Sequence, residues 1–209
     1  MTAAAPTEEA TGRLLDALAR TGFAVEPGFL PAELVASLRT RLGELEAAGR
    51  FRAAAVGAGA KRAVRPAVRG DRLCWLDPPL VAAEAALLAR TEALRAQLNA
   101  SLTLGLFDFE CQYAIYPPGS AYVRHLDRSC AGAERVLSAL FYLNDGWSAA
   151  DGGMLRLYHD SGTLEVLPEA GTLVIFASAR FEHEVCRARR ERLSVAGWFR
   201  RRARLPVGS

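Results

Sequence analysis

Two of the three histidines in this chain of 209 residues stand where they could bind a metal ion. His125 is followed two positions later by Asp127, and His183 begins a later predicted strand. Side chains two residues apart on a strand point to the same face, so the first imidazole and the carboxylate converge. Two imidazoles and one carboxylate can occupy one face of an octahedral ion and leave positions open, as a non-haem Fe(II) oxygenase requires. The spacing predicts an Fe(II) site formed by His125, Asp127 and His183, with O2 at an open position.

Arg192 is the first companion of these residues, nine positions after His183. A guanidinium pairs with a carboxylate through two parallel hydrogen bonds, so Arg192 could anchor the far end of a dicarboxylate that also binds the iron. Ser194 and Trp198 share its face of the last predicted strand, so Trp198 would wall the same cavity. Two phenols, those of Tyr116 and Tyr142, could hydrogen-bond the same cosubstrate. The alternative for both tyrosines is simple packing in the core.

The secondary structure that must position these residues is predicted to be mainly helical in the first half of the chain and mainly β-strand in the second. Apolar residues at helical spacing predict helices over residues 8–20, 31–48 and 79–100, with a short strand over 22–25. Turn residues divide the second half into short runs. Strands are predicted over residues 109–116, 121–126, 135–143, 153–158, 163–168, 172–177, 183–187 and 192–200. Short strands without intervening helices are typical of a β-sandwich or barrel.

We therefore expect one domain over residues 1–209, with a helical N-terminal part (1–106), a strand-rich core (107–200) and a basic tail (201–209). Residues 51–71 contain three glycines and one proline and show no sustained period. A loop of this length inside a compact domain is commonly a lid or a binding segment. We interpret it as a substrate-covering loop, with plain disorder as the alternative.

Composition excludes several other classes of protein. With 51% hydrophobic and 23% charged residues the chain as a whole is not disordered. No stretch approaches the roughly 18–20 apolar residues that cross a bilayer, and the first residues lack the basic and apolar regions of a secretory signal. The four cysteines form no CxxC pair. We expect a cytoplasmic protein with no membrane partner.

The positive charge is small overall and uneven along the chain. A net charge of +3 does not indicate DNA binding by itself. Between Arg187 and Arg204, however, eight arginines face a single acid, Glu191. This stretch is either a solvated strand and tail or a docking surface for an acidic partner.

The sequence around the predicted ligands, together with several other short runs along the chain, forms a recognisable set of motifs. It reads YPPGSAYVRHLD over residues 116–127, and further runs are FYLNDGW (141–147), GGMLR (152–156), HEV (183–185), RLSVAGWF (192–199) and RGDRLCW (69–75). Together they resemble the Fe(II)/2-oxoglutarate-dependent prolyl 4-hydroxylases, closest to the hypoxia-inducible-factor prolyl hydroxylases and their bacterial homologues. The resemblance covers roughly residues 10–200.

This resemblance implies an α+β fold that is mainly β: a double-stranded β-helix (jelly roll) with N-terminal helices packed against it. It also implies a role for each site residue. His125, Asp127 and His183 would bind Fe(II); Arg192 and Tyr142 would hold the C5 carboxylate of 2-oxoglutarate; Tyr116 would lie beside the cosubstrate; Trp198 would border the site. Ala196 stands where the animal enzymes have a threonine, and Ser194 could supply a hydroxyl on the same face.

The implied activity is hydroxylation of a prolyl residue of an intracellular protein at the 4-position, with release of succinate and CO2 and with ascorbate as reductant. Oxygen sensing is an associated role. Elongation factor Tu or a ribosomal protein is the candidate substrate, and we expect a monomer. Two alternatives stay open: a hydroxylase of a free amino acid or other small molecule, and a non-catalytic sensor that binds iron and 2-oxoglutarate.

Overall fold

Two antiparallel sheets form the framework of the protein. The computed structural model describes residues 8–57, 63–127 and 133–202. The larger sheet has the strand order β1-β11-β8-β13-β6-β5-β2, and the smaller has the order β10-β9-β12-β7. The bounds of the larger sheet are β1 (Phe23–Glu26), β2 (Arg52–Ala53), β5 (Arg72–Trp75), β6 (Asp108–Tyr116), β8 (Ala133–Tyr142), β11 (Leu173–Ala177) and β13 (Arg192–Arg202). Those of the smaller sheet are β7 (Tyr122–His125), β9 (Leu155–His159), β10 (Gly162–Val166) and β12 (His183–Val185).

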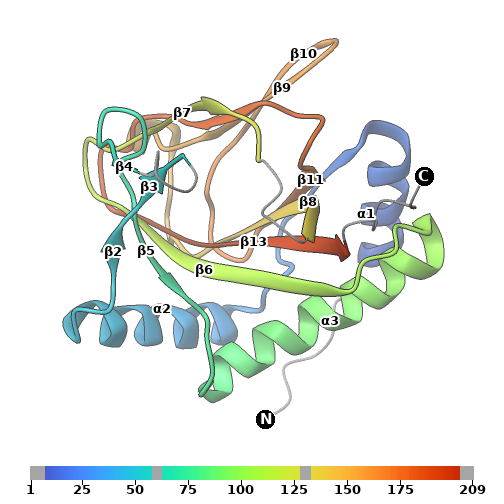
Figure 1. Ribbon diagram of the computed structural model, residues 1–209, viewed down its shortest axis with the longest axis horizontal. Helices are drawn as coiled ribbons and strands as arrows, with labels where there is room; N and C mark the ends of the chain where they lie inside the picture. The colour runs from blue at the N-terminus through green and yellow to red at the C-terminus, as the bar shows by residue number, and fades with distance from the viewer. Residues whose placement is uncertain (1–7, 58–62, 128–132, 203–209) are drawn as a thin grey trace, which may run out of the picture.

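Three helices cover the larger sheet. They are α1 (Glu8–Thr21), α2 (Ala32–Ala47) and α3 (Ala82–Leu102). Figure 1 shows α2 and α3 along one side of β6 and β13, while the strands of the smaller sheet lie on the other side. Each helix buries leucines at helical spacing, among them Leu38 on α2 and Leu98 on α3, both fully buried. The predicted fold, a jelly roll with N-terminal helices against it, is confirmed.

Alternation along β6 and β13 decides which side chains face the helices and which face the smaller sheet. Tyr113 and Ile115 on β6, with Val195 and Phe199 on β13, belong to the core under the helices. The residues between them point to the opposite face and line a pocket between the sheets. These pocket residues are Gln112, Ala114 and Tyr116 on β6, and Arg192, Ser194, Ala196 and Trp198 on β13.

The segment 51–71 is more ordered than its sequence indicates. Its described part contains β2 and the paired short strands β3 (Ala55–Val56) and β4 (Ala63–Val64), and Arg69 forms a bridge with Tyr122. Plain disorder is therefore wrong for the described residues, while 58–62 lie outside them. In the described part, β2 pairs with β5, β3 pairs with β4, and Arg69 bridges to Tyr122 on β7, and no local sequence pattern predicts these pairings.

The arginine-rich end of the chain is mostly paired. β13 continues to Arg202, so the predicted tail from 201 starts too early, and residues 203–209 lie outside the described part. Arg200 contacts Asp108 and Glu110, and Arg201 contacts Glu134. These pairs favour a structural role over a docking surface. No helix in the described ranges is long and apolar enough to span a membrane.

Candidate metal and cosubstrate site

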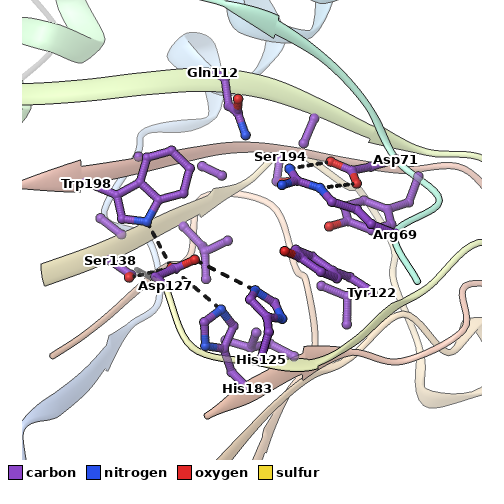
Figure 2. A pocket seen from close by; sticks show the side chains of 18 of the residues that line it. Arg69, Asp71, Gln112, Tyr122, His125, Asp127, Ser138, His183, Ser194 and Trp198 are labelled. Atoms are coloured by element: carbon purple, nitrogen blue, oxygen red, sulfur yellow. Dashed lines mark hydrogen bonds and ion pairs between the residues drawn. The ribbon is translucent and has the colours of Figure 1, made fainter. Parts of the chain in front are cut away.

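The two predicted histidines and the aspartate meet at one end of the smaller sheet. His125 ends β7 and pairs directly with His183, the first residue of β12, while Asp127 follows β7 by two residues. The Oδ1 atom of Asp127 lies 3.7 Å from Nε2 of His125, and its Oδ2 atom lies 3.6 Å from Nε2 of His183. The ligand atoms of the three residues all lie within 4.8 Å of one another. Figure 2 shows the three side chains facing a common point.

Backbone carbonyls orient both imidazoles. Nδ1 of His125 lies 2.8 Å from the carbonyl oxygen of Val123, and Nδ1 of His183 lies 3.2 Å from that of Phe181. An N–H at Nδ1 satisfies each carbonyl and leaves the Nε2 lone pair free for a metal. Burial, reinforced by His183, lowers the pKa of His125 to about 4, so this ring is neutral at neutral pH. A neutral imidazole is the form that binds metal.

Asp127 is held by two donors from the larger sheet. The Ser138 hydroxyl donates to its Oδ2 atom at 2.7 Å, and the Trp198 indole N–H donates to the same atom at 2.9 Å. Burial alone would raise the pKa of Asp127, but His183 and these two hydrogen bonds bring it below its usual value. The carboxylate is therefore ionised and fixed in orientation. Two imidazoles and an ionised carboxylate are a donor set that suits Fe(II).

Arg192 lies fully buried at the other end of the pocket. Its Nε donates to the carbonyl oxygen of Gly153 at 2.8 Å, and Nη1 donates to Ser194 Oγ at 3.4 Å. The guanidinium lies between two rings, 5.1 Å from the centre of Tyr116 and 5.0 Å from that of Tyr142. Burial raises the pKa of both phenols, that of Tyr142 to about 12, so both stay protonated.

Two buried hydrogen-bond donors, one on Arg192 and one on the adjacent Tyr142, lack an acceptor among the described residues. They are the Nη2 atom of Arg192 and the Tyr142 hydroxyl. Unpaired buried donors are costly, and here one of them carries positive charge. A carboxylate oxygen would satisfy both groups and neutralise the guanidinium. The residues present therefore fit one end of a dicarboxylate such as 2-oxoglutarate.

The remaining predicted residues lie in the same pocket or beneath it. Tyr116, Ser194 and Trp198 line the pocket, whereas Tyr142 is fully buried behind Arg192. The Ser194 hydroxyl contacts Arg192, and no hydrogen bond links it to the three predicted metal ligands within the described ranges. Trp75 is 40% exposed, because β5 lies near the edge of the larger sheet.

Several pocket residues were not predicted. Tyr122 stacks on His125 with ring centres 3.6 Å apart, and Arg69 lies over the Tyr122 ring. The Asp71 carboxylate holds Arg69 through two hydrogen bonds of 2.7 and 2.9 Å. Strand parity could have identified two others, because Ser138 lies four residues before Tyr142 and Gln112 four residues before Tyr116. No such signal exists for Arg69 and Asp71, which reach the pocket from an irregular segment.

Comparison with known proteins agrees with this geometry. Residues 111–200 match the family model of the 2OG-Fe(II) oxygenase superfamily. The chain is 42% identical to a prolyl-4-hydroxylase of Pseudomonas putida, with 92% of this chain and 100% of that chain covered and a TM-score of 0.83. A prolyl hydroxylase of Trichoplax adhaerens, solved with a peptide of hypoxia-inducible factor, is 27% identical, with 92% and 89% covered and a TM-score of 0.81.

A curated relative matches over a shorter region. It is a PKHD-type hydroxylase of Maricaulis maris, 34% identical over 92 residues, or 44% of this chain. The match covers 42% of that relative's length. Full coverage of the Pseudomonas putida enzyme, together with the oxygenase family model, establishes the family. The chain belongs to the Fe(II)/2-oxoglutarate-dependent prolyl 4-hydroxylases.

Proposed function

We propose that this protein hydroxylates a prolyl residue of a protein at the 4-position, using Fe(II), 2-oxoglutarate and O2. The balance is one substrate C–H, one 2-oxoglutarate and one O2 converted to one C–OH, succinate and CO2. The observation that carries the proposal is a pocket with His125, Asp127 and His183 at one end and Arg192 at the other, where Arg192 and the adjacent Tyr142 have unpaired donors. When bound, the iron supplies the oxidation chemistry.

The chain's own residues do three things in this proposal. The imidazoles of His125 and His183 and the ionised Asp127 would hold Fe(II) and leave room for other ligands. Arg192 and Tyr142 bind the C5 carboxylate of 2-oxoglutarate and so orient its other end toward the metal. Tyr116, Ser194 and Trp198 form walls that exclude water around the cosubstrate.

A protein substrate is supported by the relatives. The Trichoplax adhaerens prolyl hydroxylase was solved with a peptide fragment of hypoxia-inducible factor, and the Pseudomonas putida relative is named a prolyl-4-hydroxylase. We carry this substrate class over to the present chain and place its action in the cytoplasm, with ascorbate as reductant. Elongation factor Tu and the ribosomal proteins are the first candidates to test.

Mass spectrometry tests this function directly. The protein is incubated anaerobically with Fe(II), ascorbate, 2-oxoglutarate and a candidate protein, and O2 is then admitted. We expect a proline to gain the mass of one oxygen atom, one succinate to form for each, and the His125→Ala variant to give neither product. Succinate formation stimulated by free proline or lysine, but by none of the proteins or prolyl peptides, would refute the proposal.

A further inference from the structure

Gln112 is a buried polar side chain of the pocket whose amide oxygen lacks a partner. It lies on β6, is 2% exposed, and lines the pocket that contains the proposed iron ligands. Figure 2 shows its side chain pointing from β6 into the pocket. Oε1 has no hydrogen-bond partner among the described residues. Because buried amide groups are almost always paired, an unpaired one that faces a pocket indicates a ligand that supplies the donor.

The position of Gln112 separates it from the proposed cosubstrate anchor. Arg192 pairs with Tyr116 across β13 and β6, whereas Ala196 pairs with Gln112. Arg192 and Ala196 are four positions apart on β13, which corresponds to about 13 Å of strand. On its other side Gln112 pairs with Trp75 on β5, which is 40% exposed. Gln112 thus lies away from the Arg192 anchor along the strands and next to the exposed Trp75.

The charges of the pocket restrict what can bind there. Its described lining contains two arginines, Arg192 and Arg69. Arg192 is assigned to the cosubstrate, and Asp71 already holds Arg69 through two hydrogen bonds. A free amino acid would bring a carboxylate that these residues leave without a cation. A carboxamide, in contrast, is uncharged and both accepts and donates, which matches a peptide group.

We propose that Gln112 recognises the main chain of the substrate and selects a peptidyl proline over free proline. Proline has no N–H of its own, so the nearest main-chain donor after the target ring is the N–H of the next residue. Oε1 of Gln112 accepts this N–H. The inference rests on the proposed prolyl hydroxylase function. It adds that the pocket recognises the main-chain N–H that follows the target proline.

The test deletes the donor and the acceptor separately. The probes are an acetylated and amidated prolyl peptide, the same peptide with an ester in place of the amide after the proline, and free L-proline. The proteins are the wild type, Gln112→Leu, Gln112→Met and the control Gln97→Leu, since Gln97 is exposed on α3. Hydroxylated product gives KM and kcat, and the absorbance of the Fe(II)·2-oxoglutarate complex counts the loaded sites.

We expect the wild type and Gln97→Leu to bind the amide peptide better than the ester, with KM differing about tenfold, the effect of one hydrogen bond. Both Gln112 variants should show the same raised KM for the two peptides. Free L-proline should be a poor substrate of the wild type. If the folded variants distinguish amide from ester as the wild type does, Gln112 does not read this N–H.

The failure of the proposed function would look different. Loaded wild-type sites would then hydroxylate none of the capped peptides, and this outcome is seen before any variant is compared. It would overturn the inference together with the function on which it rests. A wild type that converts the amide and ester peptides with equal KM would overturn the inference alone, whether or not the variants fold.

Discussion

The side chains of the site differ in what holds them before any ligand binds. Asp127 receives hydrogen bonds from Ser138 and Trp198, and both imidazoles are oriented by backbone carbonyls. Arg192 and Tyr142 have donors left over. The proposed metal end is thus preorganised by the protein, whereas the carboxylate end is completed only by the cosubstrate. Substitutions at the two ends should therefore affect different binding constants.

Removal of the Ser138 hydroxyl should weaken metal binding. In Ser138→Ala, Asp127 keeps its indole donor but loses the hydroxyl donor, so its orientation is less fixed. Loss of such an outer partner typically costs about 10–100-fold in metal affinity. Titration with Mn(II), followed by calorimetry, measures the effect. Ser101→Ala, on the exposed end of α3, is the control and should match the wild type. Equal affinities in the two variants would contradict the role of Ser138.

Replacement of Arg192 by lysine should raise the KM for 2-oxoglutarate. Lysine keeps the positive charge but lacks the planar fork that binds a carboxylate through two hydrogen bonds. Loss of one charge-assisted hydrogen bond costs about 1.5–3 kcal/mol, so the KM should rise at least about tenfold. Succinate formation measures it, and Arg20→Lys, exposed on α1, is the control. An unchanged KM in folded Arg192→Lys would place the anchor elsewhere.

The sequence predicts part of this site because strand parity is a local property. His125 and Asp127 are two residues apart, and Arg192, Ser194 and Trp198 alternate on one strand, so their common face follows from spacing. The meeting of His183 with His125 depends on pairing between β12 and β7, so residue type suggested His183 as a ligand but no local spacing contains this pairing. Arg69 reaches Tyr122 from a segment without periodicity, so neither spacing nor composition indicates it.

At the scale of elements, the pairing of β13 with β6 is close at Gly197. A Cβ atom built there would lie 2.3 Å from the Phe109 ring, 2.7 Å from the Cys111 Cβ and 2.8 Å from the Glu110 carbonyl oxygen. The backbone of Glu110 cannot move without disturbing the pairing of the two strands. Glycine is required at this position for space rather than for its backbone dihedrals.

The variant Gly197→Ala should therefore destabilise the protein. Overpacking of this kind costs about 1–3 kcal/mol, and the contact with backbone places the value at the upper end. The matched change Gly43→Ala, in an exposed position of α2 with no atom within 4 Å, should stabilise by about 0.5–1 kcal/mol. Urea unfolding of both variants gives the two free energies. If Gly197→Ala also raised the free energy of unfolding, the crowding at Gly197 would be relieved by movement of the neighbouring atoms.

The helices and strands are predicted correctly where a periodic apolar pattern extends over many residues or where turn residues mark the ends of a strand. All three helices and the eight strands of the second half lie within a few residues of their predicted bounds. β5 was missed because its four residues alternate neither in polarity nor in burial. The exposure of Trp75 has another cause, because its place near the sheet edge follows from strand order. Strand order is a tertiary property that local patterns do not contain.

At the scale of the whole molecule, stability and site lie on opposite faces of the larger sheet. The core under the helices includes Leu98 of α3 together with Phe199 and Tyr113, while the pocket lies on the other face. The two faces share the backbone of β6 and β13, and Ala139 on β8 belongs both to the core and to the pocket lining. Damage to one face should therefore leave the other largely intact in the molecules that stay folded.

The variant Leu98→Ala tests this separation. Leu98 is fully buried, so truncation should lower the free energy of unfolding by about 2–5 kcal/mol through lost contacts and a residual cavity. Mn(II) affinity per folded molecule should stay within about twofold of the wild type, the reverse of the result expected for Ser138→Ala. Thermal unfolding and metal titration of both variants give the comparison. A parallel loss of affinity in Leu98→Ala would show that the helices help to shape the site.

The two hydrogen bonds to Asp127 have a practical consequence for anyone who wishes to capture the natural target with an inert form of the protein. Asp127 follows a strand of the smaller sheet and accepts hydrogen bonds from Ser138 and Trp198 of the larger sheet. Its carboxylate therefore also connects the two sheets. Its removal would leave the Trp198 indole without its acceptor and loosen the contact between the two sheets. Within the described ranges the His125 side chain forms no hydrogen bond to the larger sheet, which makes His125→Ala the better bait for pull-down experiments.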